Sequence, residues 1–184
     1  MHKRGGPIYH EDFSGGGKLG ASVARNLYSM GWQVTINEKD PKLVADDSEL
    51  WSDEFPRDKV TVRQGDFMDL KWDQLLEPHH CNGCAPECTT FCNLASNKHG
   101  RTLASNKDGR VTAHNPRGTT LEALEANSWI QRKAEQYTRM LDKDPDFFFW
   151  MENPEGFLQH LDIVKKELCG DEIKACIVPL SQCW

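Results

Sequence analysis

A strand, a glycine-rich turn, a helix and a second strand follow one another near the start of the chain, and this order most constrains the fold. Residues 8–13 are typical of a short strand that enters the turn at 14–20. The apolar residues that recur at helical spacing after the turn are Leu19, Val23, Leu27 and Met30. Gly31 ends the helix, and residues 32–37 form the next strand. A unit of this kind is right-handed and predicts a parallel sheet.

The remaining periodic segments extend the same architecture. Further strands are expected at 60–66, 147–151 and 173–178, and further helices from Thr119 to about Leu141 and from Gly156 to about Leu168. Thr119 and Glu122 are spaced as a capping box, and the apolar run 147–151 is typical of a buried central strand. The sequence therefore predicts an α/β fold of the Rossmann-like type: a mostly parallel sheet flanked by helices as a three-layer sandwich.

Length and charge limit the classes of protein that remain. A chain of 184 residues predicts a single domain, and its net charge of −6 argues against nucleic-acid binding over the whole surface. Residues 93–118 differ, because they hold five basic residues and one acidic residue in a context typical of a mobile loop. We expect a soluble intracellular protein, since no apolar run could span a membrane or act as a secretory signal.

Candidate binding residues fall at the carboxyl ends of the first three strands, where ligands of open parallel sheets collect. Glycines 15–17 allow a close approach of the backbone to a ligand. Glu38 ends the second strand, where it can accept both hydroxyls of a ribose, and Asp66 ends the third, where it can accept an adenine amino group. Phe13 is placed to pack beside the ligand. A bare tight turn remains an alternative, whereas the glycine spacing does not match a dinucleotide fingerprint.

Four of the seven cysteines crowd into one short segment and suggest a second kind of site. Cys81, Cys84, Cys88 and Cys92, which follow two histidines, have a spacing that a zinc ion could use. A second, distant Cys-x-x-Cys pair, which a zinc ribbon needs, does not follow. The alternatives are therefore a metal site, one reactive cysteine with incidental neighbours, and neither.

Several motifs together resemble those of the DNA cytosine-5 methyltransferases, in the order in which that family has them. The matching segments are 12–17 (Asp-Phe-Ser-Gly-Gly-Gly), 31–34 (Gly-Trp-Gln-Val), 40–42 (Asp-Pro-Lys), 65–66 (Gly-Asp), 86–91 (Pro-Glu-Cys-Thr-Thr-Phe) and 151–154 (Met-Glu-Asn-Pro). The chain looks most similar to the short, phage-like members. The resemblance covers about residues 8–183 and implies a class I methyltransferase fold that uses S-adenosylmethionine.

The resemblance also implies roles for individual residues. Phe13, Ser14, Gly15, Gly17, Glu38, Asp66 and Pro86 would bind the methyl donor. Cys88 occupies the position of the nucleophile that adds to cytosine C6, and Glu152 occupies that of the acid near N3. Asn153 and Pro154 would shape the pocket of a base that has left the DNA duplex.

The DNA itself is expected to contact the basic segment 98–117, in particular through Arg101 and Arg110. Glu87 stands where the family has a second proline, and its carboxylate is expected to raise the pKa of the Cys88 thiol. The family continues with another strand and an arginine-bearing motif, so a C-terminally truncated form is one expectation. A methyltransferase of another substrate class and a non-catalytic donor- or zinc-binding module are the alternatives.

Overall fold

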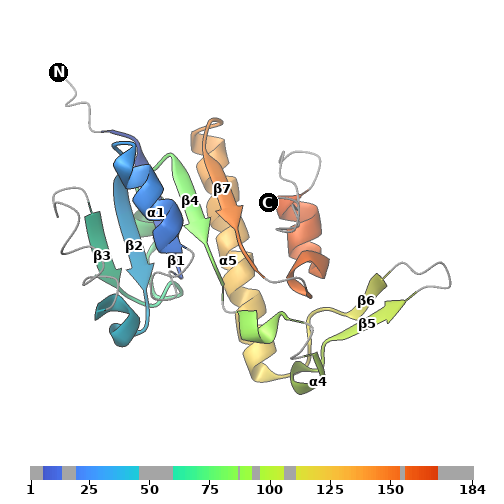
Figure 1. Cartoon of the computed structure of the whole chain (residues 1–184). Helices are drawn as coiled ribbons and strands as arrows, with labels where there is room; N and C mark the ends of the chain where they lie inside the picture. Colours follow the sequence, from blue (N-terminus) through green and yellow to red (C-terminus); the bar gives the residue numbers. More distant parts are fainter. Residues whose placement is uncertain are drawn as a thin grey trace. The chain divides into compact units, whose positions relative to one another are not determined.

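The computed structural model describes residues 6–13, 20–45, 60–86, 88–92, 96–105, 111–153 and 156–169 (Figure 1). The strands are β1 (Ile8–Asp12), β2 (Gln33–Glu38), β3 (Val60–Gln64), β4 (Cys81–Cys84), β5 (Thr102–Ser105), β6 (Val111–Asn115) and β7 (Phe148–Met151). The helices are α1 (Gly20–Ser29), α3 (Trp72–Leu75), α4 (Ser96–His99) and α5 (Leu121–Lys143), with the short helical segments η1 (Cys88–Thr90), η3 (Leu158–His160) and η4 (Val164–Leu168).

Five strands form an all-parallel sheet in the order β3-β2-β1-β4-β7. The chain runs from β1 to β2 and β3 on one side, then returns to β4 on the other side of β1. This reversal next to β1 is the topological switch point of a Rossmann-like fold. The predicted class, a parallel α/β sheet flanked by helices, is confirmed.

The core on one face of the sheet forms because side chains alternate along each strand. Tyr9, Val34, Ile36 and Cys81 point to the same face and pack with Ala24 of α1. All five are almost completely buried. The helix and the two strands that the sequence predicted around this face are confirmed, with ends that differ by a residue or two.

Two hydrogen bonds join buried polar side chains beside the core. The Tyr9 hydroxyl donates to Glu11 Oε2 (3.0 Å), and burial, followed by the negative charge of Glu11, raises the pKa of Tyr9. On the opposite face the amide of Asn82 donates to Asp12 Oδ2 (3.0 Å), with both residues buried. A hydrogen bond of this kind offsets the cost of removing polar groups from water, so the short polar strand β4 can occupy an interior position in the sheet.

The strand β7 is confirmed, but its predicted central position is not matched by the described sheet. β7 is the last strand in the order, and the side chain of Phe148 is 51% exposed. The predicted strand 173–178 lies outside the described residues. The apolar residues of 147–151 pack on both faces of the sheet: Phe147 and Phe149 stack on each other on one face, whereas Trp150 packs against the core on the other.

The chain divides into two compact units: residues 1–86 with 139–152, and residues 87–138 with 153–184. In the second unit, the segment predicted as a loop contains α4 and an antiparallel hairpin, β5 with β6. A hairpin forms because Thr102–Leu103 and Val111–Thr112 are strand-forming residues on either side of a polar stretch. Within the described residues of 93–118, α4 and the two strands of the hairpin occupy most positions.

The long helix α5 begins one residue later than the capping box predicted. Thr120, not Thr119, caps it, since Thr120 Oγ1 accepts the amide hydrogen of Ala123 (3.3 Å). Ile130, Ala134 and Tyr137 lie on one face of α5 and are almost completely buried.

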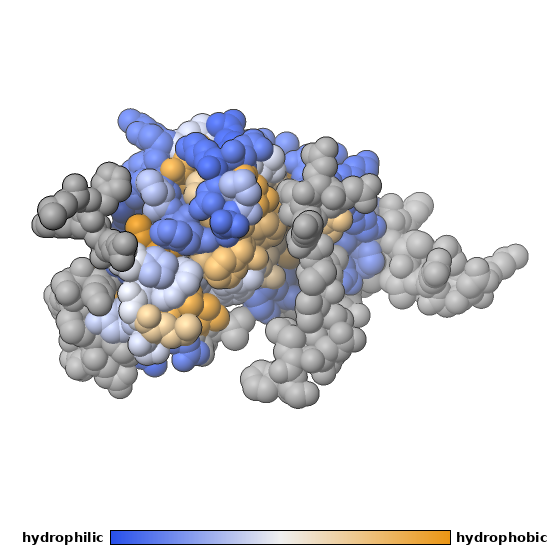
Figure 2. Space-filling view, turned by 90° about the horizontal axis from the view of Figure 1, so that it is seen from above, coloured by the Kyte–Doolittle hydropathy of each residue, from blue (hydrophilic) through white to orange (hydrophobic). Residues whose placement is uncertain are grey.

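The surface carries hydrophobic as well as hydrophilic side chains. Figure 2 shows hydrophilic and hydrophobic residues interleaved on the face in view. Within the described part of the chain, no helix is both long and apolar enough to cross a membrane.

The close packing around Gly83 in β4 leaves no room for a side chain, and this can be tested by substitution. A β-carbon at Gly83 would collide with the Tyr9 hydroxyl and the Trp150 ring, so Gly83→Ala is expected to lower the free energy of unfolding by about 1–3 kcal/mol. Urea denaturation measures the change. Gly65→Ala is the matched control, because a β-carbon there meets its nearest neighbour at 3.6 Å, and it should change the free energy by less than about 0.5 kcal/mol.

Candidate functional site

The carboxyl ends of β1, β2 and β3 bring Phe13, Glu38 and Asp66 to one edge of the sheet. The amide nitrogen of Phe13 donates to the carbonyl of Asn37 (3.2 Å), and that of Gly65 donates to the carbonyl of Glu38 (2.9 Å). These bonds continue the strand pairing by one residue past each strand end. Three of the residues predicted to bind a nucleoside are therefore neighbours, as the parallel topology requires.

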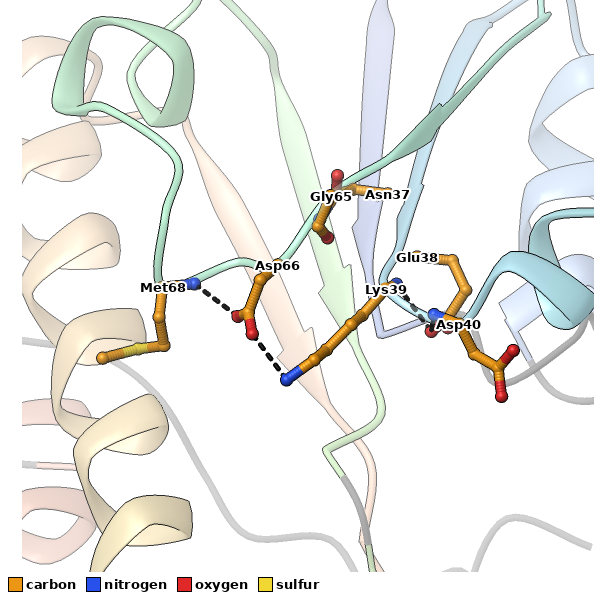
Figure 3. A network of polar contacts seen from close by, with 7 residues as sticks. All are labelled: Asn37, Glu38, Lys39, Asp40, Gly65, Asp66 and Met68. Carbon is orange, nitrogen blue, oxygen red and sulfur yellow. Dashed lines mark hydrogen bonds and ion pairs between the residues drawn. The ribbon is translucent and has the colours of Figure 1, made fainter.

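The carboxylate of Glu38 is held in place by the backbone that follows it. Its Oε1 atom accepts the amide hydrogens of Lys39 (2.7 Å) and Asp40 (3.0 Å), and the residue is only 8% exposed (Figure 3). A carboxylate bonded in this way cannot rotate freely, so it is fixed in orientation before any ligand arrives.

Asp66 is bound on two sides. Oδ1 accepts the amide hydrogen of Met68 (2.9 Å), and Oδ2 forms an ion pair with Lys39 Nζ (2.6 Å), as Figure 3 shows. Burial alone raises the pKa of Asp66, but the hydrogen bonds from Lys39 and Met68 and the charge of Lys39 outweigh it, so the pKa is lowered. The carboxylate is therefore ionised at neutral pH and able to accept hydrogen bonds.

Phe13 has an unusual backbone conformation. Its φ angle is +63°, the only positive value at a non-glycine residue among those described, and its ring packs against Phe67 (centroids 5.2 Å apart). A bulky residue in this region costs on the order of 1–3 kcal/mol, and such residues cluster at functional sites. The strained residue directly precedes, in the sequence, the predicted glycine-rich turn 14–20, whose residues Ser14, Gly15 and Gly17 lie outside the described part of the chain.

Asn37 is a member of this edge that the sequence reasoning missed. Its amide nitrogen donates to the carbonyl of Gly65 (3.3 Å), while Oδ1 is buried and has no hydrogen-bond partner among the described residues. Asn37 is 6% exposed. The sequence offered one signal for Asn37: it is a polar residue near the end of a strand that is otherwise typical of a buried one.

Two of the four clustered cysteines, Cys81 and Cys84, do not face each other in the first unit. Cys81 and Cys84 are three residues apart on β4, so they point to opposite faces, and Cys81 belongs to the apolar core beside α1. Burial raises the pKa of Cys81 to about 12, which keeps its thiol protonated. Among the described side chains no group of three potential metal ligands occurs. The side chain of Cys88 is not among the described ones. The geometry of β4 therefore tests only whether Cys81 and Cys84 could share a metal ion.

Two further predicted residues lie at the carboxyl ends of β4 and β7 in the first unit. Glu152 follows β7, and its amide nitrogen donates to the carbonyl of Cys84 (2.9 Å). Burial raises the pKa of Glu152, which favours its protonated form. Pro86 is buried two residues after β4. Asn153 belongs to the second unit, and Pro154, Glu87 and Arg110 lie outside the described residues.

The buried position of Arg101 contradicts its predicted role as a phosphate contact. The residue is 0% exposed, and its guanidinium donates to the carbonyls of Pro116 and Ala123 and to Asn127 Oδ1. Burial lowers the pKa of Arg101 to about 10, which leaves the side chain charged. A side chain enclosed on all sides cannot reach a nucleic acid, and the prediction failed because a basic composition does not distinguish solvated residues from buried ones.

The chain is similar to several solved structures over part of its length. They include the CMeT domain of the citrinin polyketide synthase (18% identity, 50% of this chain, 24% of that chain, TM-score 0.39). The glycopeptide N-methyltransferase MtfA, complexed with sinefungin, matches at 16% identity over 60% of this chain and 53% of that one (TM-score 0.38). A putative Zn-dependent alcohol dehydrogenase from Rhodobacter sphaeroides matches at 12% identity over 77% and 52% of the two chains (TM-score 0.37).

Identities and TM-scores this low describe a partial likeness of fold and carry no argument about activity. No protein-family model matches the chain, and no curated protein matches its sequence.

The Lys39–Asp66 ion pair leads to a prediction about the charge state of this edge. Lys39→Met removes both the hydrogen bond and the positive charge, so the pKa of Asp66 should rise toward that of an ordinary aspartate. Carboxyl-carbon NMR titration measures it. Lys42→Met, which removes an exposed lysine three residues away, is the control, and equal titration curves for the two variants would contradict the assignment.

Proposed function

We propose that the chain is an S-adenosylmethionine-dependent methyltransferase of the DNA cytosine-5 type. The observation that carries the proposal is the arrangement at the carboxyl edge of β1, β2 and β3, where Phe13, Glu38 and Asp66 are neighbours. Carboxylates at two adjacent strand ends suit a nucleoside, which offers ribose hydroxyls and an amino group as donors.

The chemistry of the residues present fits a nucleoside-bearing donor. Glu38 is buried and oriented, and Asp66 is ionised, so both can accept further hydrogen bonds. The buried Oδ1 atom of Asn37 adds an acceptor that has no partner among the described residues. When bound, S-adenosylmethionine supplies an electrophilic methyl group. Phe13 would pack beside it, and Ser14, Gly15, Gly17 and Pro86 would complete its binding site.

The reaction of this chain's own groups begins at Cys88. Its thiolate adds to C6 of the cytosine, the electron pair of the C5–C6 double bond makes C5 nucleophilic, and Glu152 donates a proton to N3. After C5 is methylated, loss of the C5 proton and departure of the thiolate restore the ring. The raised pKa of Glu152 supports a role as a proton donor, whereas Glu87 beside Cys88 opposes formation of the thiolate.

DNA is the proposed partner because the resemblance implies a cytosine in a duplex, which must leave the stack to reach Cys88. With Arg101 buried, the phosphate contacts are assigned to exposed basic residues of the segment 98–117. Lys98 and Arg117 are exposed, and Arg110 is the other candidate from the sequence.

Binding of the product S-adenosylhomocysteine tests the donor site by calorimetry. Glu38→Ala should weaken binding by about 1–3 kcal/mol, because hydrogen bonds to a charged group are lost. Glu77→Ala, which removes only a surface ion pair with Arg63, is the control and should leave affinity unchanged. The donor assignment fails if the parent protein does not bind, or if Glu38→Ala binds as tightly as the parent.

A second experiment tests the nucleophile with duplexes of random sequence that contain 5-fluorocytosine. Fluorine at C5 blocks the loss of a proton there, so the covalent complex through Cys88 should persist in denaturing gels. Cys88→Ala should abolish it, whereas Cys169→Ala, a cysteine outside the motif, should not. Equal trapping by Cys88→Ala and the parent would exclude Cys88 as the nucleophile.

A further inference from the structure

Arg101 is the largest completely buried side chain described in the second unit, and it is a cation. Its guanidinium donates to two carbonyls and one side-chain amide, and no described carboxylate forms an ion pair with it. Burying a charge without a counter-charge is costly, and a structure retains it only where the charge is well hydrogen-bonded. The arrangement therefore joins the chain at Pro116 to the first two turns of α5.

The guanidinium also lies over the ring of a residue next to the turn that carries Cys88. Its central carbon is 4.5 Å from the centroid of the Phe91 ring, which is itself completely buried. Phe91 directly follows the single turn η1, Cys88–Thr90. A cation over an aromatic face is attractive, and the flat guanidinium stacks in a way that a lysine ammonium does not. Arg101 thus restrains the residue at the end of the Cys88 turn.

The same turn is held from its other side by the chain that follows Glu152-Asn153-Pro154. The amide nitrogen of Phe157 donates to the carbonyl of Phe91 (2.7 Å), and Cys92 pairs with Gly156 in an antiparallel bridge. A β-carbon at Gly156 would collide with the Phe91 carbonyl and lie 3.0 Å from Cys92 Cα. Only glycine permits this close crossing of the two segments.

We infer that Arg101 and Gly156 are positioning residues that together fix the backbone of the Cys88 turn and so set the placement of the nucleophile. The inference rests on the proposed function in one respect, the role of Cys88. Because an enzyme gains much of its rate from accurate placement of reacting groups, a loosened turn should slow the covalent step without weakening donor binding.

The test compares Arg101→Met, the milder Arg101→Lys and Gly156→Ala in the full chain. Arg139→Met is the matched control, because Arg139 makes the same kind of stack, 4.0 Å over the Trp72 ring, in the first unit. Hydrogen–deuterium exchange reports on the peptide 88–92 directly, with β1 and β4 of the same sample as the measure of intact folding. Trapping on 5-fluorocytosine duplexes and calorimetry with S-adenosylhomocysteine report on function.

In Arg101→Met and Gly156→Ala, exchange at 88–92 should be about tenfold faster or more, while β1 and β4 stay protected as in the parent. The trapping rate should fall about tenfold, and the affinity for S-adenosylhomocysteine should stay within about twofold. In exchange and in trapping, Arg101→Lys should give values between those of the parent and Arg101→Met. Arg139→Met should match the parent in every measurement.

Unchanged exchange at 88–92 in variants with intact sheets would overturn the inference whether or not the protein is active. Faster exchange combined with trapping at the parental rate would also overturn it, since the turn would then move without affecting the nucleophile. A parent that exchanges as expected but neither traps DNA nor binds S-adenosylhomocysteine would refute the proposed function instead, and with it the assignment of Cys88 as the nucleophile that the turn positions.

Discussion

The parallel pairing of β1 with both β2 and β4 is the constraint on which the first unit depends. β1 lies between the two halves of the sheet, and its side chains face the core on one side and a buried polar pair on the other. If this pairing shifted by one residue, Tyr9 would leave the core and Asp12 would lose Asn82. The strand ends that carry Phe13, Glu38 and Asp66 would then no longer meet.

The edge of the sheet is ordered before a ligand is bound. Backbone amides hold Glu38, an ion pair and a backbone amide hold Asp66, and Phe13 is kept at a positive φ angle. Fixing these groups in the folded protein removes part of the entropy cost of binding. The energy for this order comes from the buried sheet, because polar groups and a strained residue are retained only where the surrounding packing determines their positions.

In the second unit, a buried arginine side chain holds the neighbouring segments in place. Pro116 after the hairpin, the start of α5 and the residue after the Cys88 turn meet around one buried guanidinium, which donates to two backbone carbonyls and to Asn127 Oδ1 and lies over the Phe91 ring. Arginine suits this position because it can bind several acceptors and stack at once, whereas its charge alone would destabilise a buried site. The residue read from the sequence as a surface contact is thus internal to its unit.

The sequence by itself determined the class of fold and the edge of the sheet at which Phe13, Glu38 and Asp66 meet. Apolar periodicity, the glycine turn and polar residues at strand ends are local signals, and parallel topology places the ends of β1, β2 and β3 together without further information. Only the tertiary structure decided the burial of Arg101, the pairing of 102–105 with 111–115, and the acceptor left at Asn37 Oδ1. These depend on which distant groups meet, and no local pattern of residue types records that.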